Sequence, residues 1–440
     1  MKKSQENLIP SISRRNLLLG AAGLALGSPS TTQANKIKSK ARIVIIGSGL
    51  GGIAIANRLS NALDGISITI IDKKEEHNYQ PGYTLVATGI WPVSKIRDKN
   101  ADFLPKGIHW IKEMVADFDP ANNTVITQSG EKVRYDFLVV ATGTHQDWSM
   151  IEGMDIAAIG NHGLTSVYPS PEAAEATWKT MDQFRQKGGQ AILTLPATPL
   201  KCAGAPLKMT FMLHDRLTQT GAIKNSTIKF YSALGNVFSV KSVNDNVLQR
   251  WDKMGIEVEL IQKMTAIDLE KREATFSSPE GDKVKASYDF IHVVPPMRAP
   301  DCVKNSPLAW QEGSFALGGW LEVDPKTLQH RRFSNVFGIG DINGTPRGKT
   351  AATIKKSAPL VTQHIIDAIN NKSPTQEFDG YTSCPLLLKE GSAMLIEFDY
   401  EGRLTPSLPM IEPLQASYFA WLMKYRMLKP AYMAVLKGRV

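Results

Sequence analysis

Short apolar runs and longer stretches with helical spacing follow one another along most of the chain. Residues 41–46, 66–71 and 190–195 are apolar runs with the length and composition of buried strands. Residues 53–59 and 208–217 repeat apolar positions every three or four residues, which predicts helices. Buried strands that alternate with helices predict an α/β fold with two Rossmann-like, doubly wound domains.

A glycine-rich turn separates the first predicted strand from the first predicted helix. Residues 47–52 read Gly-Ser-Gly-Leu-Gly-Gly, and an acidic residue, Asp72, stands 20 residues after the last glycine. This GxGxxG turn lets backbone N–H groups approach a pyrophosphate, while the acid can accept hydrogen bonds from a ribose. We predict a dinucleotide site that contains Gly47, Gly49, Leu50, Gly51, Gly52 and Asp72.

Two later strand ends indicate which dinucleotide binds. Residues 135–143 end in Ala-Thr-Gly, and residues 335–341 end in Gly-Ile-Gly-Asp. Together with the first glycine turn, they resemble the FAD-binding pattern of flavoprotein oxidoreductases that have two dinucleotide-binding domains. That resemblance implies FAD, with Asp341 at its ribityl chain.

Relatives of that class that use NAD(P)H carry a second glycine motif in the middle third of the chain. Its expected place here is residues 227–238, which contain a single glycine, Gly235, flanked by bulky residues. A pyrophosphate needs close approach of the backbone, so we do not expect a nicotinamide site there. The electrons that reach the flavin should come from another donor.

A stiff loop with one of the chain's three cysteines follows the predicted strand at 190–195. Prolines at positions 196, 199 and 206 fix φ around Cys202. The thiol stands at a predicted helix start, near Lys201 and Lys208, and both features favour its thiolate. The local sequence leaves two interpretations open, a reactive thiol or a buried structural cysteine.

Composition and charge exclude several classes of function. With 440 residues and 42% hydrophobic residues, the chain is typical of a multidomain globular enzyme. Three cysteines are too few for a disulfide framework, and no Cys/His group has zinc-ligand spacing, so we expect no metal. Most of the net charge of +9 lies in one apolar C-terminal segment, which does not indicate nucleic-acid binding.

The N-terminus has the features of an export signal. Lys2, Lys3, Arg14 and Arg15 precede a short apolar run at 17–26 that is too short to span a bilayer. The two arginines resemble a twin-arginine signal. We predict a signal peptide over residues 1–34 and a periplasmic location; an uncleaved anchor is the alternative.

The C-terminus is both basic and apolar. Residues 418–440 carry five basic residues and no acid, interleaved with aromatic residues and Met, and Pro430 should divide the segment into two short helices. This pattern predicts amphipathic helices that lie on a membrane surface. The alternative is a helix packed on the core with a solvated basic face.

Five longer motifs extend the resemblance to one family. They are residues 77–84, 198–206, 292–297, 328–332 and 379–385, which read HNYQPGYT, TPLKCAGAP, HVVPPM, LQHRR and DGYTSCP. From about residue 42 to the C-terminus, the chain resembles sulfide:quinone oxidoreductases. The resemblance implies FAD, a redox pair formed by Cys202 and Cys384, and three small-molecule partners: sulfide, a sulfur acceptor and membrane quinone.

The same resemblance implies roles for further residues. Lys208 and Lys424 match lysines near the active site and the quinone end. Flavin-site positions are matched by Gln80, Val115, Lys349 and Thr350. The related flavocytochrome c subunit has a flavin-linking cysteine, and residues 79–84 here contain none, so the implied FAD is noncovalent. The sequence leaves open whether the protein forms a homo-oligomer.

Other interpretations stay open beside this one. A flavoprotein sulfide dehydrogenase that donates to a soluble cytochrome, and a non-enzymatic sulfur carrier, would use similar motifs. A type II NADH dehydrogenase is disfavoured because the second glycine motif is absent. We interpret Cys302 as an unpaired free thiol, and His77, His109 and His145 as packing or hydrogen-bonding residues.

The predicted domain organisation combines these elements. It consists of a signal peptide (1–34), an FAD-binding domain in two parts (35–160 and 321–385), a second Rossmann-like domain that carries Cys202 (161–320) and a C-terminal region with membrane-binding helices (386–440).

Overall fold

A five-stranded parallel sheet forms the first half of the molecule in the computed structural model, which describes residues 36–440. Its strand order is β22 (Val336–Gly338), β11 (Phe137–Val140), β2 (Arg42–Ile46), β4 (Ser67–Ile71) and β7 (His109–Ile111). Ile46 pairs with Ile71 on one side and Val140 on the other. Because all five strands run the same way, their carboxyl ends, including the glycine turn after β2, gather at one edge.

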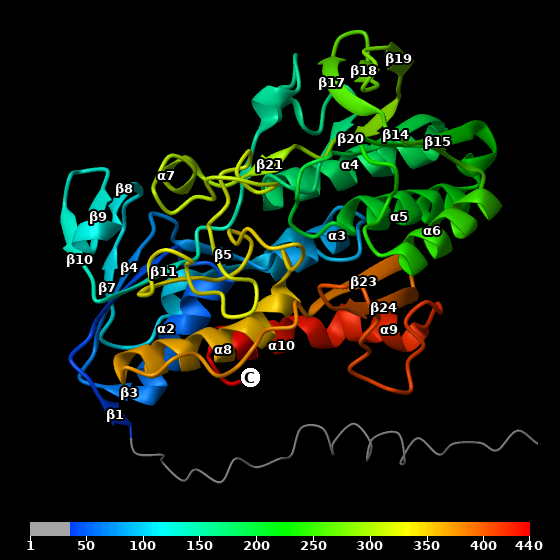
Figure 1. The fold of residues 1–440 in the computed structure, drawn as a ribbon. Coiled ribbons are helices and arrows are strands. Elements are labelled where there is room, and N and C mark those ends of the chain that lie inside the picture. The colour runs from blue at the N-terminus through cyan, green and yellow to red at the C-terminus, as the bar shows by residue number, and fades with distance from the viewer. Residues whose placement is uncertain (1–35) are drawn as a thin grey trace, which may run out of the picture. The chain divides into compact units, whose positions relative to one another are not determined.

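Helices α2 (Leu50–Ala62), α8 (Ala351–Ile369) and α10 (Leu428–Leu436) pack together along this half of the molecule (Figure 1). Isoleucines of β2 and β4 form a core with α2 and α8, in which Ile43, Ile45 and Ile70 have no exposed surface. These strands are apolar on both faces, as expected for a parallel sheet with both faces covered.

A second parallel sheet forms the other half. Its strand order is β13 (Leu164–Thr165), β20 (Phe290–His292), β14 (Gly189–Leu195), β15 (Ser226–Ser232) and β16 (Ile256–Glu259). The helices α4 (Pro171–Lys187), α5 (Ala205–Thr220) and α6 (Lys241–Lys253) connect or flank these strands (Figure 1). The two parallel sheets confirm the predicted doubly wound α/β fold.

The order of the second sheet corrects one prediction. The chain moves outward from β14 through β15 to β16 and then returns on the other side of β14 as β20. The order therefore reverses at β14, and the turn that would hold a pyrophosphate in this topology follows β14. The prediction had placed that turn after β15, at 227–238. The loop at 196–204, which carries Cys202, occupies the position instead.

Antiparallel elements complete the fold. One three-stranded sheet consists of β8 (Val115–Asp119), β9 (Thr124–Thr127) and β10 (Lys132–Arg134), and another consists of β17 (Lys263–Asp268), β18 (Glu273–Ser277) and β19 (Lys283–Ser287). Two short pairs are β5 (Glu76–Asn78) with β6 (Arg97–Lys99), and β12 (His145–Gln146) with β21 (Met297–Arg298). A longer pair is β23 (Thr382–Lys389) with β24 (Ser392–Phe398). Two short helices are α3 (Tyr83–Val86) and α7 (Asp301–Lys304). The β23–β24 hairpin matters most for function, because it packs against α5 and carries Cys384.

The C-terminal segment is helical from Tyr418 to Leu436. A π-helix, Met423–Met427, joins α9 (Tyr418–Leu422) to α10. Pro430 lies inside α10, so the predicted division at this residue is wrong. Proline has no N–H for the carbonyl four residues earlier, and the change in the helix occurs in the turn before it. Within residues 36–440, no helix is long and apolar enough to cross a membrane.

The predicted signal peptide at 1–34 lies outside the described residues.

Candidate functional site

The glycine turn after β2 has the geometry of a nucleotide-binding turn. Gly47 has φ +102°, and a Cβ added there would lie 2.5 Å from the carbonyl oxygen of Ala141. A Cβ on Gly52 would lie 1.9 Å from the Gly47 carbonyl oxygen. Gly49, in contrast, has nothing within 4 Å of the position a Cβ would take. Two glycines thus permit close packing, while the third leaves the open approach that a pyrophosphate needs.

Asp72 holds this turn in place. Its Oδ2 accepts hydrogen bonds from the backbone N–H (2.7 Å) and hydroxyl (2.8 Å) of Ser48, and its Oδ1 accepts one from the Lys74 N–H (2.8 Å). The carboxylate therefore links the ends of β2 and β4. Its predicted contact with a ribose stays a prediction.

A cavity of about 470 Å³ lies near the carboxyl end of β11. Its wall includes the predicted flavin residues Gln80 and Asp341, together with Lys201 and Tyr168. Burial raises the pKa of the Asp341 carboxyl, and the nearby Lys349 and Lys201 oppose that shift. The Nζ of Lys201 donates to Gln80 Oε1 at 2.9 Å, and burial lowers the pKa of Lys201 to about 8.

Three polar side-chain atoms in the wall of this cavity are buried and have no hydrogen-bond partner within the described chain. They are Asn78 Oδ1, Thr142 Oγ1 and Gln146 Oε1. Buried polar atoms normally have a partner, so the wall fits a ligand rich in hydrogen-bonding groups. A flavin with its ribityl chain has that chemistry, and the open face of Gly49 fits the phosphates of the same cofactor.

Lys349 and Thr350 connect the flavin-side residues to the cysteines. Lys349 is buried, and its Nζ donates to the carbonyl oxygens of Asp341 (2.7 Å) and Asn343 (2.8 Å). Burial lowers the pKa of Lys349 to about 7. Thr350 caps α8, and its hydroxyl lies 2.8 Å from that of Thr382 at the start of β23. Lys349 therefore fixes the backbone around Asp341, and Thr350 joins the start of α8 to the strand that carries Cys384.

Val115 occupies a different place from the other predicted flavin residues. It begins β8 and is buried in the same core cluster as Ile71 and Ile111. It does not line the cavity described above. The cofactor contact implied for it stays a prediction.

The Cys202 backbone has an unusual conformation. Its φ of 51° lies in the left-handed region, which costs a non-glycine residue roughly 1–2 kcal/mol. Its N–H donates to the Lys349 carbonyl at 2.9 Å, and its own carbonyl accepts from the Ala205 N–H (2.7 Å) and the Tyr168 hydroxyl (3.4 Å). These contacts hold the loop in the strained form, which agrees with the predicted stiffness.

The second cysteine, Cys384, lies on β23 and packs against the beginning of α5. A Cβ added to Gly204 would lie only 2.1 Å from Cys384 Sγ, so helix and strand are in close contact at this point. Cys384 is 5% exposed and Cys202 is partly exposed; both thiols are free. Burial raises the pKa of the Cys384 thiol, while Lys208 and Lys424 oppose that shift.

Lys208 lies between the two cysteines. Its Nζ is 3.5 Å from Cys202 Sγ. Burial alone would lower the pKa of Lys208, but its interactions with Cys202 and Cys384 outweigh this and raise it. The structure thus brings together two cysteines that are far apart in the sequence, around one buried cation.

Lys424 is a second buried cation beside the pair. It lies in the π-helix, is 2% exposed, and donates from Nζ to the Pro81 carbonyl at 2.5 Å. Burial and the nearby Lys208 lower the pKa of Lys424 to about 7, although the two cysteines oppose that shift. A wide turn of this kind is often found at functional sites.

Sequence reasoning missed Tyr168. Its ring is buried, its hydroxyl contacts the Cys202 carbonyl, and the residue lines the cavity. Burial, and then the two cysteines, raise the pKa of the Tyr168 hydroxyl. No local pattern marks this residue, because the tertiary fold alone brings it to the thiols.

The remaining candidates lie elsewhere. Cys302 belongs to a different core cluster from Cys202 and Cys384, and burial raises the pKa of its thiol to about 11. His77 is buried between the Asn100 amide and the Tyr432 hydroxyl, each 2.8 Å from a ring nitrogen. Both observations agree with structural roles for these residues.

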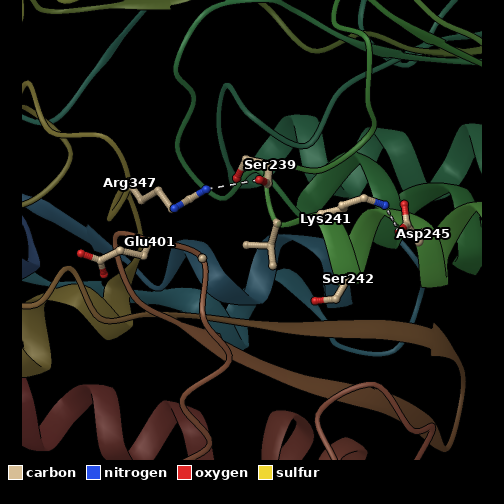
Figure 2. Close-up of a pocket in the computed structure, with 8 residues that line it drawn as sticks. Ser239, Lys241, Ser242, Asp245, Arg347 and Glu401 are labelled. Carbon is tan, nitrogen blue, oxygen red and sulfur yellow. Dashed lines mark hydrogen bonds and ion pairs between the residues drawn. The ribbon is translucent and has the colours of Figure 1, made fainter.

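A second cavity, of about 490 Å³, lies beside the beginning of α6 (Figure 2). Two of its basic residues contact protein groups: Arg347 donates to the Ser239 carbonyl at 3.2 Å, and Lys241 pairs with Asp245 at 2.6 Å. None of the predicted site residues lines it.

Comparison with known proteins identifies the family. Residues 41–189 match the pyridine nucleotide-disulphide oxidoreductase family. A mitochondrial sulfide:quinone oxidoreductase of Dictyostelium discoideum is 35% identical over 93% of this chain and 89% of its own length. The chain belongs to the sulfide:quinone oxidoreductase family. The mouse mitochondrial sulfide:quinone oxidoreductase is 33% identical over 84% of this chain and 81% of its own length.

A solved structure of a sulfide:quinone oxidoreductase supports the same fold. The enzyme of Aquifex aeolicus superposes with a TM-score of 0.74 at 23% identity, and the match covers 91% of this chain and 92% of that one. The predicted family resemblance is thus confirmed. As a member of this family, the protein is an FAD-dependent oxidoreductase.

Proposed function

We propose that the protein oxidises sulfide at the Cys202–Cys384 pair and passes the electrons through FAD to quinone. The observation that carries this proposal is the arrangement around Lys208: two free thiols share one buried ammonium, beside a cavity whose polar wall fits a flavin. The relatives named sulfide:quinone oxidoreductase support the choice of donor and acceptor.

The first step is an exchange at the oxidised pair. Hydrosulfide attacks Cys202 Sγ, so that a sulfur–sulfur bond forms there while the bond between the two cysteines breaks. Cys384 leaves as a thiolate, which the ammonium groups of Lys208 and Lys424 stabilise. Attack on Cys202 is favoured because Cys202 is partly exposed, whereas Cys384 is buried.

The pair must then return to its oxidised form. Transfer of the outer persulfide sulfur to a small-molecule acceptor frees the Cys202 thiolate. Closing the Cys202–Cys384 bond again releases two electrons. Bound FAD supplies the two-electron acceptor for this step and the link to quinone. The loop contacts of Cys202 and the packing of Cys384 on Gly204 fix the position of each cysteine beside α5.

We propose that the C-terminal helices lie on a membrane surface. One side of the segment is buried, with Ala420, Trp421 and Lys424 in the core. Tyr418, Phe419 and Met427 are 68%, 43% and 49% exposed. The sequence left two alternatives, helices on a membrane surface or a helix packed on the core. The segment has features of both, since one side packs on the core and the other exposes apolar residues. An exposed apolar surface with basic neighbours suits a lipid interface.

The quinone should arrive from this same side of the molecule. The exposed residues and the buried Lys424 lie on one continuous segment, so a path from the lipid to the thiol and flavin region is short. We further propose export by the twin-arginine signal to the periplasmic side of the membrane. The support for that proposal is the N-terminal sequence alone.

We also propose the domain organisation given above. Residues 35–160 and 321–385 would bind FAD, and 161–320 would present Cys202 to it. The two parallel sheets, each with its own helices, support this division.

Anaerobic titration of the purified flavoprotein with sulfide tests the proposal. With a small-molecule acceptor present to take the outer persulfide sulfur, sulfide should bleach the visible absorbance of oxidised flavin, and a quinone analogue should restore it. Cys202→Ser should abolish bleaching, while the matched variant Cys302→Ser should bleach like the parent. Bleaching at the parent rate in Cys202→Ser would contradict the mechanism. If a soluble cytochrome reoxidised the flavin and a quinone analogue did not, the electron acceptor would be a cytochrome and the proposal of quinone would be wrong.

A further inference from the structure

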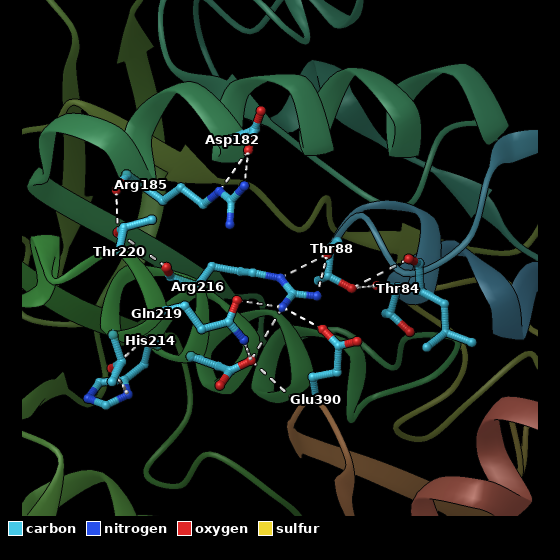
Figure 3. A network of polar contacts seen from close by, with 12 residues as sticks. Thr84, Thr88, Asp182, Arg185, His214, Arg216, Gln219, Thr220 and Glu390 are labelled. Atoms are coloured by element: carbon cyan, nitrogen blue, oxygen red, sulfur yellow. Dashed lines mark hydrogen bonds and ion pairs between the residues drawn. The ribbon is translucent and has the colours of Figure 1, made fainter.

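Arg216 on α5 is a buried arginine that joins three segments of the chain (Figure 3). Its side chain is 5% exposed. Nε and Nη2 both donate to the carbonyl oxygen of Thr88, at 3.0 and 2.9 Å, and Nη1 donates to Glu390 Oε2 at 2.8 Å. A planar guanidinium can make all three contacts at once, which an ammonium cannot.

The joined segments are those that deliver the functional residues. Helix α5 carries Lys208 and begins just after Cys202. Thr88 follows α3, in the same stretch as Gln80 and Pro81. Glu390 forms the turn after β23, the strand that carries Cys384.

Helix α5 and strand β23 are fixed to each other at both ends. At one end, Cys384 Sγ packs against Gly204; at the other, Arg216 binds Glu390. The twelve residues from Gly204 to Arg216 cover roughly 18 Å of helix, and the six from Cys384 to Glu390 cover roughly 20 Å of strand. These lengths agree, so the helix cannot slide along the strand without breaking one of the two contacts.

Further polar contacts stabilise the Arg216 end. Asp215 Oδ2 accepts from the Glu390 N–H at 3.1 Å and lies 3.6 Å from Arg216 Nη1. Gln219 Oε1 accepts from Arg216 Nη1 at 3.0 Å, and its Nε2 donates to Asp215 Oδ2 at 3.0 Å. The charge of Arg216 is thus balanced by two carboxylates within a closed network.

We propose that Arg216 is a positioning residue that sets the distance between Cys202 and Cys384, and so the ease with which their bond closes. This inference rests on the proposed redox role of the pair. In the closing reaction the two thiols lose two protons and two electrons as the Sγ–Sγ bond forms. In a thiol redox buffer, the buffer's disulfide takes them and becomes two thiols.

The test measures this closure directly, without sulfide or quinone. The FAD-loaded protein is equilibrated with mixtures of reduced and oxidised dithiothreitol, free thiols are alkylated, and mass spectrometry gives the fraction of closed pair. Arg216→Met should reduce the closure equilibrium at least tenfold, a change of about 30 mV in the potential of the pair. Arg216→Lys should recover part of the loss, and Glu390→Gln should show a smaller loss.

Arg185→Met is the matched control. Arg185 lies on the neighbouring helix α4, and its guanidinium pairs with Asp182 at 2.6 Å (Figure 3). This variant should close like the parent. A merely structural role for Arg216 would lower the unfolding temperature and leave the potential of the folded protein unchanged, and that result would overturn the inference.

Two further outcomes separate the inference from the proposed function. If Arg216→Met does not fold, Arg216→Lys and Glu390→Gln still decide, since unchanged potentials in both would contradict positioning. If the parent protein itself forms no Cys202–Cys384 bond in any mixture, then the proposed redox pair is wrong and the inference fails with it.

Discussion

At the scale of single residues, the site depends on a few side chains that are buried at high cost. Lys208 and Lys424 are both nearly inaccessible to solvent, and the thiols of Cys202 and Cys384 lie nearby. A buried ammonium destabilises the fold unless it is paired. The arrangement is therefore best explained by chemistry that forms thiolates at this position.

Gly204 is the residue at which a single added methyl group should be most damaging to the pair. Its Cβ would lie 2.1 Å from Cys384 Sγ, so Gly204→Ala must displace the Cys384 sulfur, either by rotating that side chain or by moving α5 and β23 apart. We expect a stability loss of about 1–3 kcal/mol and at least a tenfold loss in sulfide-dependent flavin reduction. Chemical denaturation and stopped-flow absorbance measure the two effects.

Gly235→Ala is the control for that substitution. Gly235 has nothing within 4 Å of its Cβ position. The Gly235→Ala variant should therefore show the same rate of sulfide-dependent flavin reduction as the parent protein. Normal flavin reduction in Gly204→Ala would show that the close contact with Cys384 is unimportant.

Lys424 predicts a pH dependence of stability. Burial lowers its pKa from 10.5 to about 7. Below pH 7 the folded protein contains the buried charge, and between pH 7 and 10.5 the unfolded chain binds a proton that the folded protein does not. This group therefore makes the free energy of unfolding rise with pH in that window, by up to about 1.4 kcal/mol per pH unit.

Lys424→Met should flatten the rise, and denaturant unfolding at several pH values across the window measures it. Lys437→Met, which changes an exposed lysine of the same C-terminal segment, should keep the parent slope. An identical slope in Lys424→Met and the parent would contradict the burial argument.

At the scale of elements, the sequence predicts what local patterns determine. The apolar runs gave β2, β4 and β14, and the glycine turn after β2 has the expected open and closed positions. Strand order is not a local property, and this is why the nucleotide-type turn of the second sheet was placed after β15. Tyr168 and Arg216 could not be found for the same reason, because long-range contacts alone define their environment.

The C-terminal helices carry the prediction that belongs to this scale. Replacing the exposed Tyr418, Phe419 and Met427 together by Ser should weaken binding to phosphatidylcholine–phosphatidylglycerol vesicles by at least about tenfold, because apolar area is lost from the lipid contact. Vesicle sedimentation measures the bound fraction, and circular dichroism checks the fold.

Exposed apolar residues elsewhere provide the comparison. Leu317 and Ile261 are 92% and 49% exposed and lie outside the C-terminal helices. Replacing both by Ser should leave vesicle binding unchanged. Equal loss in the two variants would mean that the C-terminal segment is not a specific membrane surface.

At the scale of the whole molecule, the second sheet supplies a cysteine at the position where related folds bind a second nucleotide. The loop after β14 has prolines and a strained Cys202 in place of a glycine motif, and β23 supplies the second cysteine. The fold therefore places Cys202 on this turn, next to Lys201, which lines the cavity proposed for the flavin.

The most direct test of this account is a single turnover with sulfide in the absence of quinone and sulfur acceptor. Peptide mass spectrometry after rapid alkylation should find one added sulfur atom on Cys202 and none on Cys302, while the flavin stays oxidised because the pair cannot close before that sulfur leaves. Sulfur found only on Cys384, or flavin bleaching with no added sulfur on either member of the pair, would contradict it.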